Sequence, residues 1–214
     1  FFQGLSQGLK PYSAVNTSQF SQATQVAVEE SYTALVNPVE GTILSVMQAW
    51  SDSLVEASRT SPDFQKVWKI SLEAAQIALD YTPEQLKVLK DAGVVDAAGR
   101  GFVCILEGVM NFMDTGDVRR LPSIETGFAS VALEMDELTA DNLAFPFCTE
   151  CIIAGENIPR DKLSQTMKPL GDSIVIAGSK HRAKIHIHTD DPANLFEVLS
   201  QFGEIQQQKV DDMR

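Results

Sequence analysis

The sequence lacks a long hydrophobic run and a surplus of positive charge. No apolar stretch approaches the roughly 18 residues that a membrane-spanning helix requires, so the sequence predicts no transmembrane segment. The 214 residues include 17 Lys and Arg against 29 Asp and Glu, which gives a net charge of −12. There is no surplus of Lys and Arg to displace the counterions of a phosphate backbone, which argues against nucleic acid as a partner.

Cysteine is scarce, and an initiator methionine and a secretion signal are both absent. Three cysteines without a signal peptide are typical of a reducing compartment, and we expect a cytoplasmic protein. Cys104 is expected to be a small buried residue within a helix. The chain begins at Phe1, and residues 1–5 have the pattern of a helix already under way, so we expect a piece of a longer chain. Hydrophobic residues make up 44% of the sequence, which is enough for one or two domain cores.

Residues 1–114 are predicted to be helical, because their apolar residues recur at the spacing of one helix face. Such runs begin near Thr17, Thr42 and Asp63, and Pro38 ends the first of them. The residues predicted to face inward include Trp50, Leu54, Val67, Trp68, Ile70, Ala74 and Ile77.

The stretch from Thr82 to Gly101 predicts two helix starts that are joined by a glycine turn. Thr82 is a suitable N-cap with Pro83 at the first helical position, and Gly93 is a suitable C-terminal glycine. Asp96 is expected to cap the next helix, whose first turn is almost bare of side chains. A bare helix N-terminus can bind a phosphate through its N–H groups, but small residues also suit tight helix packing. The residues alone leave both interpretations open.

Residues 115–143 are predicted to be a linker, with a short helix near Ser130–Leu138. Gly116, Pro122 and Gly127 interrupt any periodic pattern there.

From residue 144 the pattern changes from helical to alternating, which predicts a second, α+β domain at 144–214. The element order is βαββαβ, the ferredoxin-like plan, in which the first and third strands are neighbours at the centre of the sheet. The expected strands are 147–154, 173–177, 183–189 and 205–210, and the expected helices are 159–167 and 192–202.

The third predicted strand alternates strictly between apolar and histidine side chains. Ile185 and Ile187 would face one side of the sheet, and His186 and His188 the other. The helices are expected to cover the isoleucines. The two histidines would lie about 7 Å apart between Cα atoms, a separation at which two imidazoles can share one metal ion.

The first predicted strand places Cys148 and Glu150 on one face, beside the histidines if the two strands are neighbours. One cysteine and two histidines suit zinc, with a fourth position for water, Glu150 or a substrate group. The alternative is a polar sheet face whose histidines are hydrogen-bonded to their neighbours. A redox pair of Cys148 and Cys151 is not expected, because residues three apart on a strand point to opposite faces. Cys151 is therefore predicted to lie in the apolar layer.

Six segments in a fixed order carry a resemblance to a known family. They are PVEGTIL at 38–44, TPE at 82–84, LKDAGVVDA at 89–97, FCTE at 147–150, LGDS at 170–173 and KIHIHTDDP at 184–192. Together they make the chain resemble the ATP-binding subunit of bacterial fatty acid kinase. The N-terminal domain of that subunit is itself similar to the nucleotide-binding L subunit of dihydroxyacetone kinase.

The resemblance implies an all-helical, DhaL-like bundle or barrel that binds ATP, followed by the middle domain of the family. The implied nucleotide-binding residues are Thr42, Asp96, Gly99 and Gly101. The implied zinc ligands, which would also be the catalytic residues of this domain, are Cys148, His186 and His188.

The reaction that the resemblance implies is phosphoryl transfer from Mg-ATP to the carboxylate of a carrier-bound fatty acid. The expected partner is a DegV-type fatty-acid-binding protein or a fused DegV-type domain, and a homodimer is also considered. The family's magnesium-binding motif, D-G-D-T-G, and its phosphate loop are absent from the sequence. Since the phosphates would then lack their main charge partner, this chain is expected to be inactive by itself.

Two other functions are compatible with the residues. A non-catalytic scaffold could use the Cys/His cluster as a structural metal site. A kinase of the dihydroxyacetone type could use the helical domain, although the α+β domain argues against it because the small-substrate enzyme lacks such an appendage.

Overall fold

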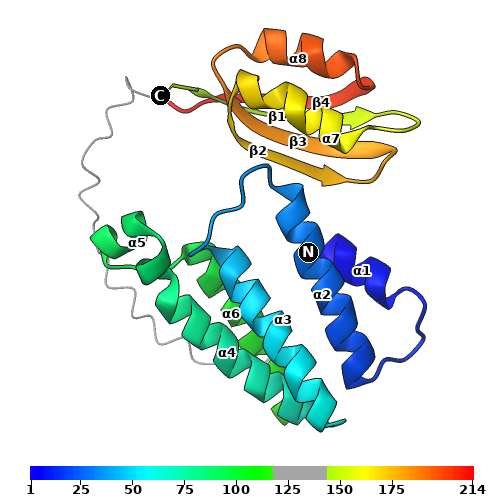
Figure 1. Ribbon diagram of the computed structural model, residues 1–214, viewed down its shortest axis with the longest axis vertical. Coiled ribbons are helices and arrows are strands. Elements are labelled where there is room, and N and C mark those ends of the chain that lie inside the picture. Colours follow the sequence, from blue (N-terminus) through cyan, green and yellow to red (C-terminus); the bar gives the residue numbers. More distant parts are fainter. Residues whose placement is uncertain (118–143) are drawn as a thin grey trace. The chain divides into compact units, whose positions relative to one another are not determined.

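The computed structural model describes residues 1–117 and 144–214. The described residues form two compact units, one with residues 1–32 and 38–117, the other with residues 33–37 and 144–214. The first unit is helical, and the second is a sheet with helices (Figure 1), so the predicted α+β class with two domains is confirmed. The short helix expected near Ser130–Leu138 lies outside the described residues, as does most of the predicted linker.

Six helices lie within residues 1–117. Among the described residues, none of the helices combines the length and the apolar character needed to cross a membrane. The bounds of the six are α1 Phe2–Leu9, α2 Thr17–Ala34, α3 Ile43–Thr60, α4 Phe64–Gln85, α5 Lys87–Ala92 and α6 Ala97–Thr115.

Aromatic side chains form the centre of the helical unit. Trp50 and Trp68 are 2% and 6% exposed, and their ring centroids lie 5.5 Å apart in an edge-to-face contact. Phe102 packs on Trp50 in the same manner at 5.5 Å. The indole N–H of Trp68 donates to the carbonyl of Leu106 at 3.0 Å. Such ring pairs stabilise a core by about 0.5–1.5 kcal/mol beyond the area that they bury, and the expectation that both tryptophans are core residues is confirmed.

The prediction that Ile70 and Ile77 face inward is wrong. They are 40% and 70% exposed, whereas Leu72 and Leu79 on the same helix are 9% and 3% exposed. α4 has apolar residues on two faces, and helical spacing alone cannot say which face meets the core. Cys104 was expected to be buried and is instead exposed on α6, because the core-facing positions of that helix are Phe102, Val103 and Leu106.

The prediction that Thr82 begins a helix is also wrong. Thr82 and Pro83 lie inside α4, and α5 begins later, at Lys87. Pro83 has no N–H to donate to the carbonyl of Leu79, four residues earlier. The hydroxyl of Thr82 donates to that carbonyl instead, at 2.7 Å, so the helix continues through the proline to Gln85. The predicted C-terminal glycine, Gly93, is confirmed at φ 66°.

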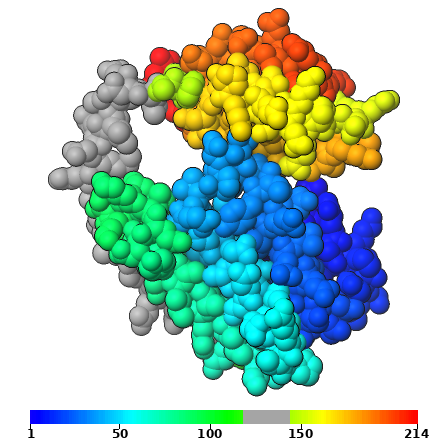
Figure 2. All heavy atoms as spheres, viewed as in Figure 1, coloured from blue at the N-terminus to red at the C-terminus, as the bar shows by residue number. Residues whose placement is uncertain are grey.

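Within residues 144–214, four antiparallel strands form a sheet in the order β2-β3-β1-β4. This is the βαββαβ arrangement expected from the sequence, with β1 and β3 at the centre. α7 and α8 lie on one face (Figure 1), and Figure 2 shows them at the surface in yellow and orange. The elements are β1 Phe147–Ala154, α7 Arg160–Met167, the 3₁₀ helix η2 Lys168–Leu170, β2 Asp172–Gly178, β3 Arg182–Thr189, α8 Pro192–Ser200 and β4 Glu204–Asp212.

The core of the second unit lies between the sheet and its two helices. Ile185 and Ile187 of β3 are completely buried against a cluster that includes Leu163 of α7 and Leu199 of α8. Cys151 belongs to the same cluster and is 2% exposed, which confirms its predicted place in the apolar layer. Burial raises the pKa of the Cys151 thiol to about 11, because the thiolate would lose its hydration.

The two faces of α4 provide a stability test. Leu79→Ala removes a core side chain and should lower the free energy of unfolding of the helical unit by about 2–5 kcal/mol. Ile77→Ala, two residues away on the exposed face, should change it by less than about 0.5 kcal/mol. Chemical denaturation of the whole chain, followed by circular dichroism at 222 nm, measures both. Equal losses for the two variants would contradict the orientation of α4 described above.

Candidate metal centre and nucleotide-binding end

The register between β1 and β3 brings the candidate metal ligands together. Cys148 stands directly opposite His188, and Glu150 stands directly opposite His186. Residues that pair across antiparallel strands point to the same face. These four side chains therefore share the face of the sheet that is turned away from Ile185 and its apolar cluster.

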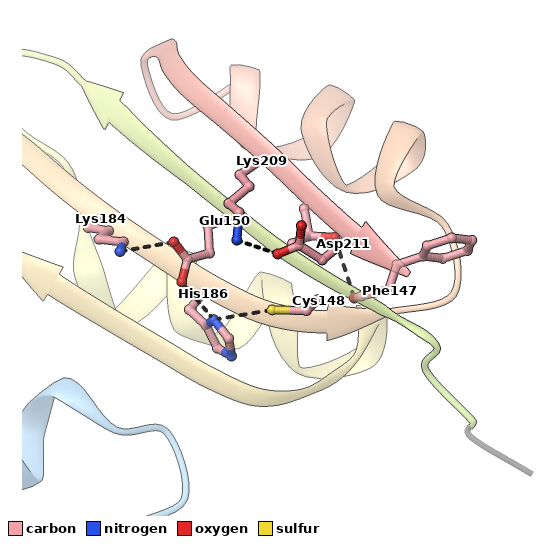
Figure 3. Close-up of polar contacts among 8 residues, drawn as sticks. Phe147, Cys148, Glu150, Lys184, His186, Lys209 and Asp211 are labelled. Atoms are coloured by element: carbon pink, nitrogen blue, oxygen red, sulfur yellow. Dashed lines mark hydrogen bonds and ion pairs between the residues drawn. The ribbon is translucent and has the colours of Figure 1, made fainter. Parts of the chain in front are cut away.

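The three predicted ligands converge. One ligand atom from each of Cys148, His186 and His188 lies within 4.8 Å of the others, and all three residues are half-buried. Sγ of Cys148 is 3.8 Å from Nδ1 of His186 (Figure 3). A tetrahedral zinc ion with bonds of about 2.3 Å to sulfur and about 2.0 Å to nitrogen holds such atoms about 3.5 Å apart. The donor set and its spacing thus fit a metal ion. Binding through Nδ1 of His186 would require this nitrogen to give up its contact with Oε1 of Glu150, which lies 3.2 Å away.

Glu150 contacts one of the histidines and a lysine. Its Oε1 lies 3.2 Å from Nδ1 of His186, and its Oε2 lies 2.9 Å from Nζ of Lys184 (Figure 3). The hydrogen bonds from Lys184 and then from His186 lower the pKa of this carboxyl, so Glu150 is ionised at neutral pH. An ionised Glu150 carboxylate therefore lies close to the three candidate ligands, where the sequence predicts it as one candidate for the fourth coordination position.

Asp172 is a residue of this site that the strand pattern did not identify. Its Oδ1 lies 3.4 Å from Nδ1 of His188. The expected start of the second strand at residue 173 left Asp172 outside the sheet, whereas β2 begins at Asp172 and pairs it with His188. Two signals were available in the sequence. Asp172 belongs to the LGDS segment that carries part of the family resemblance, and the glycine before it often marks a bulge or a close backbone approach near a strand.

The predicted nucleotide-binding residues lie at the starts of α3 and α6. Thr42 caps α3, accepting from the N–H of Leu44 at 3.4 Å and donating to the carbonyl of Val39 at 2.8 Å. Asp96 caps α6 by accepting the N–H of Gly99 at 2.6 Å. Asp96 is therefore the N-cap that the sequence predicts, and Thr42 caps the helix that was expected to begin near it.

Both helix starts meet the end of α4. A Cβ atom on Gly41 would lie 3.0 Å from the backbone nitrogen of Leu86. The N–H of Asp96 donates to the hydroxyl of Thr82 at 3.0 Å. Consequently Thr42 and Asp96 belong to the same end of the helical unit.

Gly99 and Gly101 have different surroundings. A Cβ on Gly99 would meet Val46 at 3.0 Å and Leu79 at 3.2 Å, so tight packing explains this glycine. Its N–H is already bound by Asp96, which leaves it less suited to a ligand than the sequence suggested. An added Cβ on Gly101 would have nothing within 4 Å, so packing does not explain Gly101. Nucleotide binding by these residues stays a prediction.

Two family models match the chain. Residues 1–111 match the DAK2 domain, and residues 144–214 match the FakA-like middle domain, which is named after fatty acid kinase. The first match contains the starts of α3 and α6, and the second contains the Cys/His cluster.

The chain is also similar to longer bacterial proteins. Protein YloV of Bacillus subtilis is 29% identical over 222 residues, and the uncharacterized protein SSP1546 of Staphylococcus saprophyticus is 29% identical over 221 residues. The uncharacterized protein SAB1090 of Staphylococcus aureus is 30% identical over 229 residues. Each alignment covers all of this chain and 40% of the relative. The chain therefore belongs to the family of proteins in which a DAK2 domain is joined to a middle domain of the fatty acid kinase (FakA-like) type.

Proposed function

We propose that this chain is the nucleotide-binding and metal-binding part of an ATP-dependent kinase that phosphorylates the carboxylate of a carrier-bound fatty acid. The observation that carries the proposal is the convergence of Cys148, His186 and His188 within the segment that matches the fatty acid kinase-like middle domain. A DAK2 match alone would equally suit a dihydroxyacetone-type kinase, and the middle domain favours the fatty acid as acceptor.

Zinc is the proposed metal, because one thiolate with two imidazoles is a donor set that zinc prefers. Three protein ligands leave one position for water or for an oxygen of the acceptor. A zinc ion bound there would supply a Lewis acid for a carboxylate or phosphoryl oxygen. Cys148 would bind as the thiolate, and His186 and His188 as neutral imidazoles.

A hollow beside the cluster offers room for the acceptor. A shallow hollow of about 320 Å³ borders Glu150 and is lined by Lys184, Lys209 and the apolar Ile152, among others. Each lysine is paired with a carboxylate, Lys184 with Glu150 and Lys209 with Asp211. An acyl carboxylate bound in this hollow would therefore compete with Glu150 and Asp211 for the two ammonium groups.

At the other site, the start of α6 is proposed to face the phosphates of ATP. Its exposed first turn carries the small side chains of Ala97 and Ala98, and a helix N-terminus attracts anions through its dipole and its N–H groups. Phosphoryl transfer depends mainly on positioning and charge neutralisation. Magnesium would be needed beside the residues described here.

Zinc binding by the Cys/His cluster can be measured directly. We expect about one zinc ion per purified chain by elemental analysis, since three ligands are in place. Cys148→Ser, His186→Ala and His188→Ala should each lose stoichiometric zinc.

Two substitutions outside the cluster serve as controls. Cys104→Ser and His181→Ala alter an exposed cysteine and an exposed histidine, and both should keep the zinc content of the unsubstituted chain. Stoichiometric zinc in the Cys148→Ser variant would contradict the proposed site.

The two glycines of α6 separate nucleotide binding from folding. Gly101→Ala has room for its methyl group and should stabilise the helix by about 0.5–1 kcal/mol. If the backbone at Gly101 approaches ATP, the same variant should bind ATP more weakly in calorimetric titration.

Gly99→Ala is the matched control for Gly101→Ala, since its methyl group would press on Val46 and Leu79. This variant should unfold at a lower temperature. If Gly101→Ala binds ATP with unaltered affinity, the proposal that Gly101 lies at the nucleotide is refuted.

Turnover tests the kinase proposal as a whole. With Mg-ATP and a fatty acid on its carrier protein, a polypeptide of the relatives' full length should form an acyl phosphate that hydroxylamine traps. The 214-residue chain alone should form none, because its sequence lacks the D-G-D-T-G aspartates.

Within the longer polypeptide, His186→Ala should abolish turnover while ATP affinity is retained. Undiminished turnover in that variant would refute a catalytic role for the Cys/His cluster and leave it a structural one. Turnover by the 214-residue chain alone would refute the expectation that it is inactive.

A further inference from the structure

The first residues of β2 depart from regular strand geometry. Val175, Ile176, Ala177 and Gly178 pair with β3 in one continuous register, in which Val175 stands opposite His186. If that register continued, Ser173 would stand opposite His188. A register shift intervenes, and Asp172 stands opposite His188 instead. β-Bulges of this type commonly re-aim a side chain beside a functional site.

The shift is accompanied by an unfavourable backbone conformation. Ser173 has φ 53°, a region that residues other than glycine rarely adopt and that costs of the order of 1 kcal/mol. Strained conformations persist where the surrounding structure enforces them, and they cluster at functional sites.

The residue before Asp172 shows how closely β2 approaches β3 here. A Cβ atom on Gly171 would lie 1.9 Å from the carbonyl oxygen of His188, so only glycine fits. The hydroxyl of Thr189 donates to the carbonyl of Leu170 at 2.8 Å and fixes the same approach from the other strand. Together these contacts hold the backbone at Asp172 against the backbone at His188.

The result is that a carboxylate reaches one nitrogen of a candidate metal ligand. Oδ1 of Asp172 lies 3.4 Å from Nδ1 of His188, an ion-pair contact slightly longer than the usual range of about 2.7–3.2 Å for an N–H···O hydrogen bond. If the Nδ1–H faces this carboxylate, the proton is held on Nδ1, and Nε2 carries the free lone pair. A metal-binding histidine usually donates its second ring N–H in this way, which fixes its tautomer and orientation.

We propose that Asp172 is a positioning residue for His188, and that the bulge at Ser173 and the close approach at Gly171 serve to place it there. The inference rests on the proposed zinc site. In it, the Asp172 carboxylate accepts the Nδ1–H of His188, so that Nε2 is the atom offered to the metal.

The test measures zinc affinity of the whole chain by competition with a chromophoric chelator. Asp172→Ala should weaken zinc binding by about 10–100-fold, the usual effect of losing such a partner. Asp172→Asn should weaken it less, because the amide oxygen can still accept the Nδ1–H. Asp190→Ala removes an exposed carboxylate two residues after His188 and should leave zinc affinity within about twofold of the unsubstituted chain.

Two further readouts distinguish positioning from a general loss of structure. The thermal unfolding of the metal-free chain should be the same with and without Asp172→Ala. The visible absorption bands of the cobalt-substituted chain should shift in Asp172→Ala and not in Asp190→Ala, because they report ligand geometry.

The outcomes that would overturn the inference differ from failure of the zinc proposal itself. If the unsubstituted chain binds neither zinc nor cobalt, both the proposed metal site and the proposed role of Asp172 are refuted. If the unsubstituted chain binds zinc and Asp172→Ala binds it equally well, only the role of Asp172 is refuted. An equal loss of affinity in Asp172→Ala and Asp190→Ala, or a lower unfolding temperature of metal-free Asp172→Ala, would also refute it.

Discussion

The pairing of β1 with β3 is the constraint on which the α+β unit depends. Side chains alternate along a strand, so one register assigns Ile185 and Ile187 to the apolar core and His186 and His188 to the opposite face. A slip of one residue would exchange the two faces. Each buried isoleucine contributes about 1.5–3 kcal/mol through burial. The same burial that stabilises the sheet therefore holds the candidate metal ligands in place.

An element could be predicted from the sequence where its pattern of apolar and polar residues fitted only one structure. The strand at Lys184–His188 alternates without exception, and the βαββαβ order restricts which strands can be neighbours, so the sheet and the Cys/His convergence could be predicted. The buried face of α4 could not, because Ile77 and Leu79 lie on different faces and are equally apolar. The start of a helix at Thr82 was wrong because a capping residue followed by proline looks the same at a helix start and inside its last turns. Asp172 was missed because a bulge breaks the two-residue period on which the strand prediction relied.

The two candidate sites differ in how their geometry is maintained. At the Cys/His cluster, strand register places the two imidazoles, and each of them contacts one carboxylate, Glu150 at His186 and Asp172 at His188. At the start of α6, small residues perform two tasks, since Gly99 allows close packing while Gly101 leaves the surface bare. Glycines at a helix start can therefore indicate either tight packing or an open surface. The two roles can be distinguished only when the neighbours of each glycine are known.

The hydroxyl of Thr82 connects segments that are far apart along the chain. It donates to the carbonyl of Leu79 and accepts the N–H of Asp96, and Asp96 in turn binds the N–H of Gly99. Opening any one of these hydrogen bonds leaves its donor and its acceptor without a partner, which costs free energy unless water replaces them. We therefore expect the last turn of α4 and the first turn of α6 to open together. Fluctuations at this end of the helical unit would therefore be shared by both helices, and a molecule that orders one of them would also reduce the motion of the other.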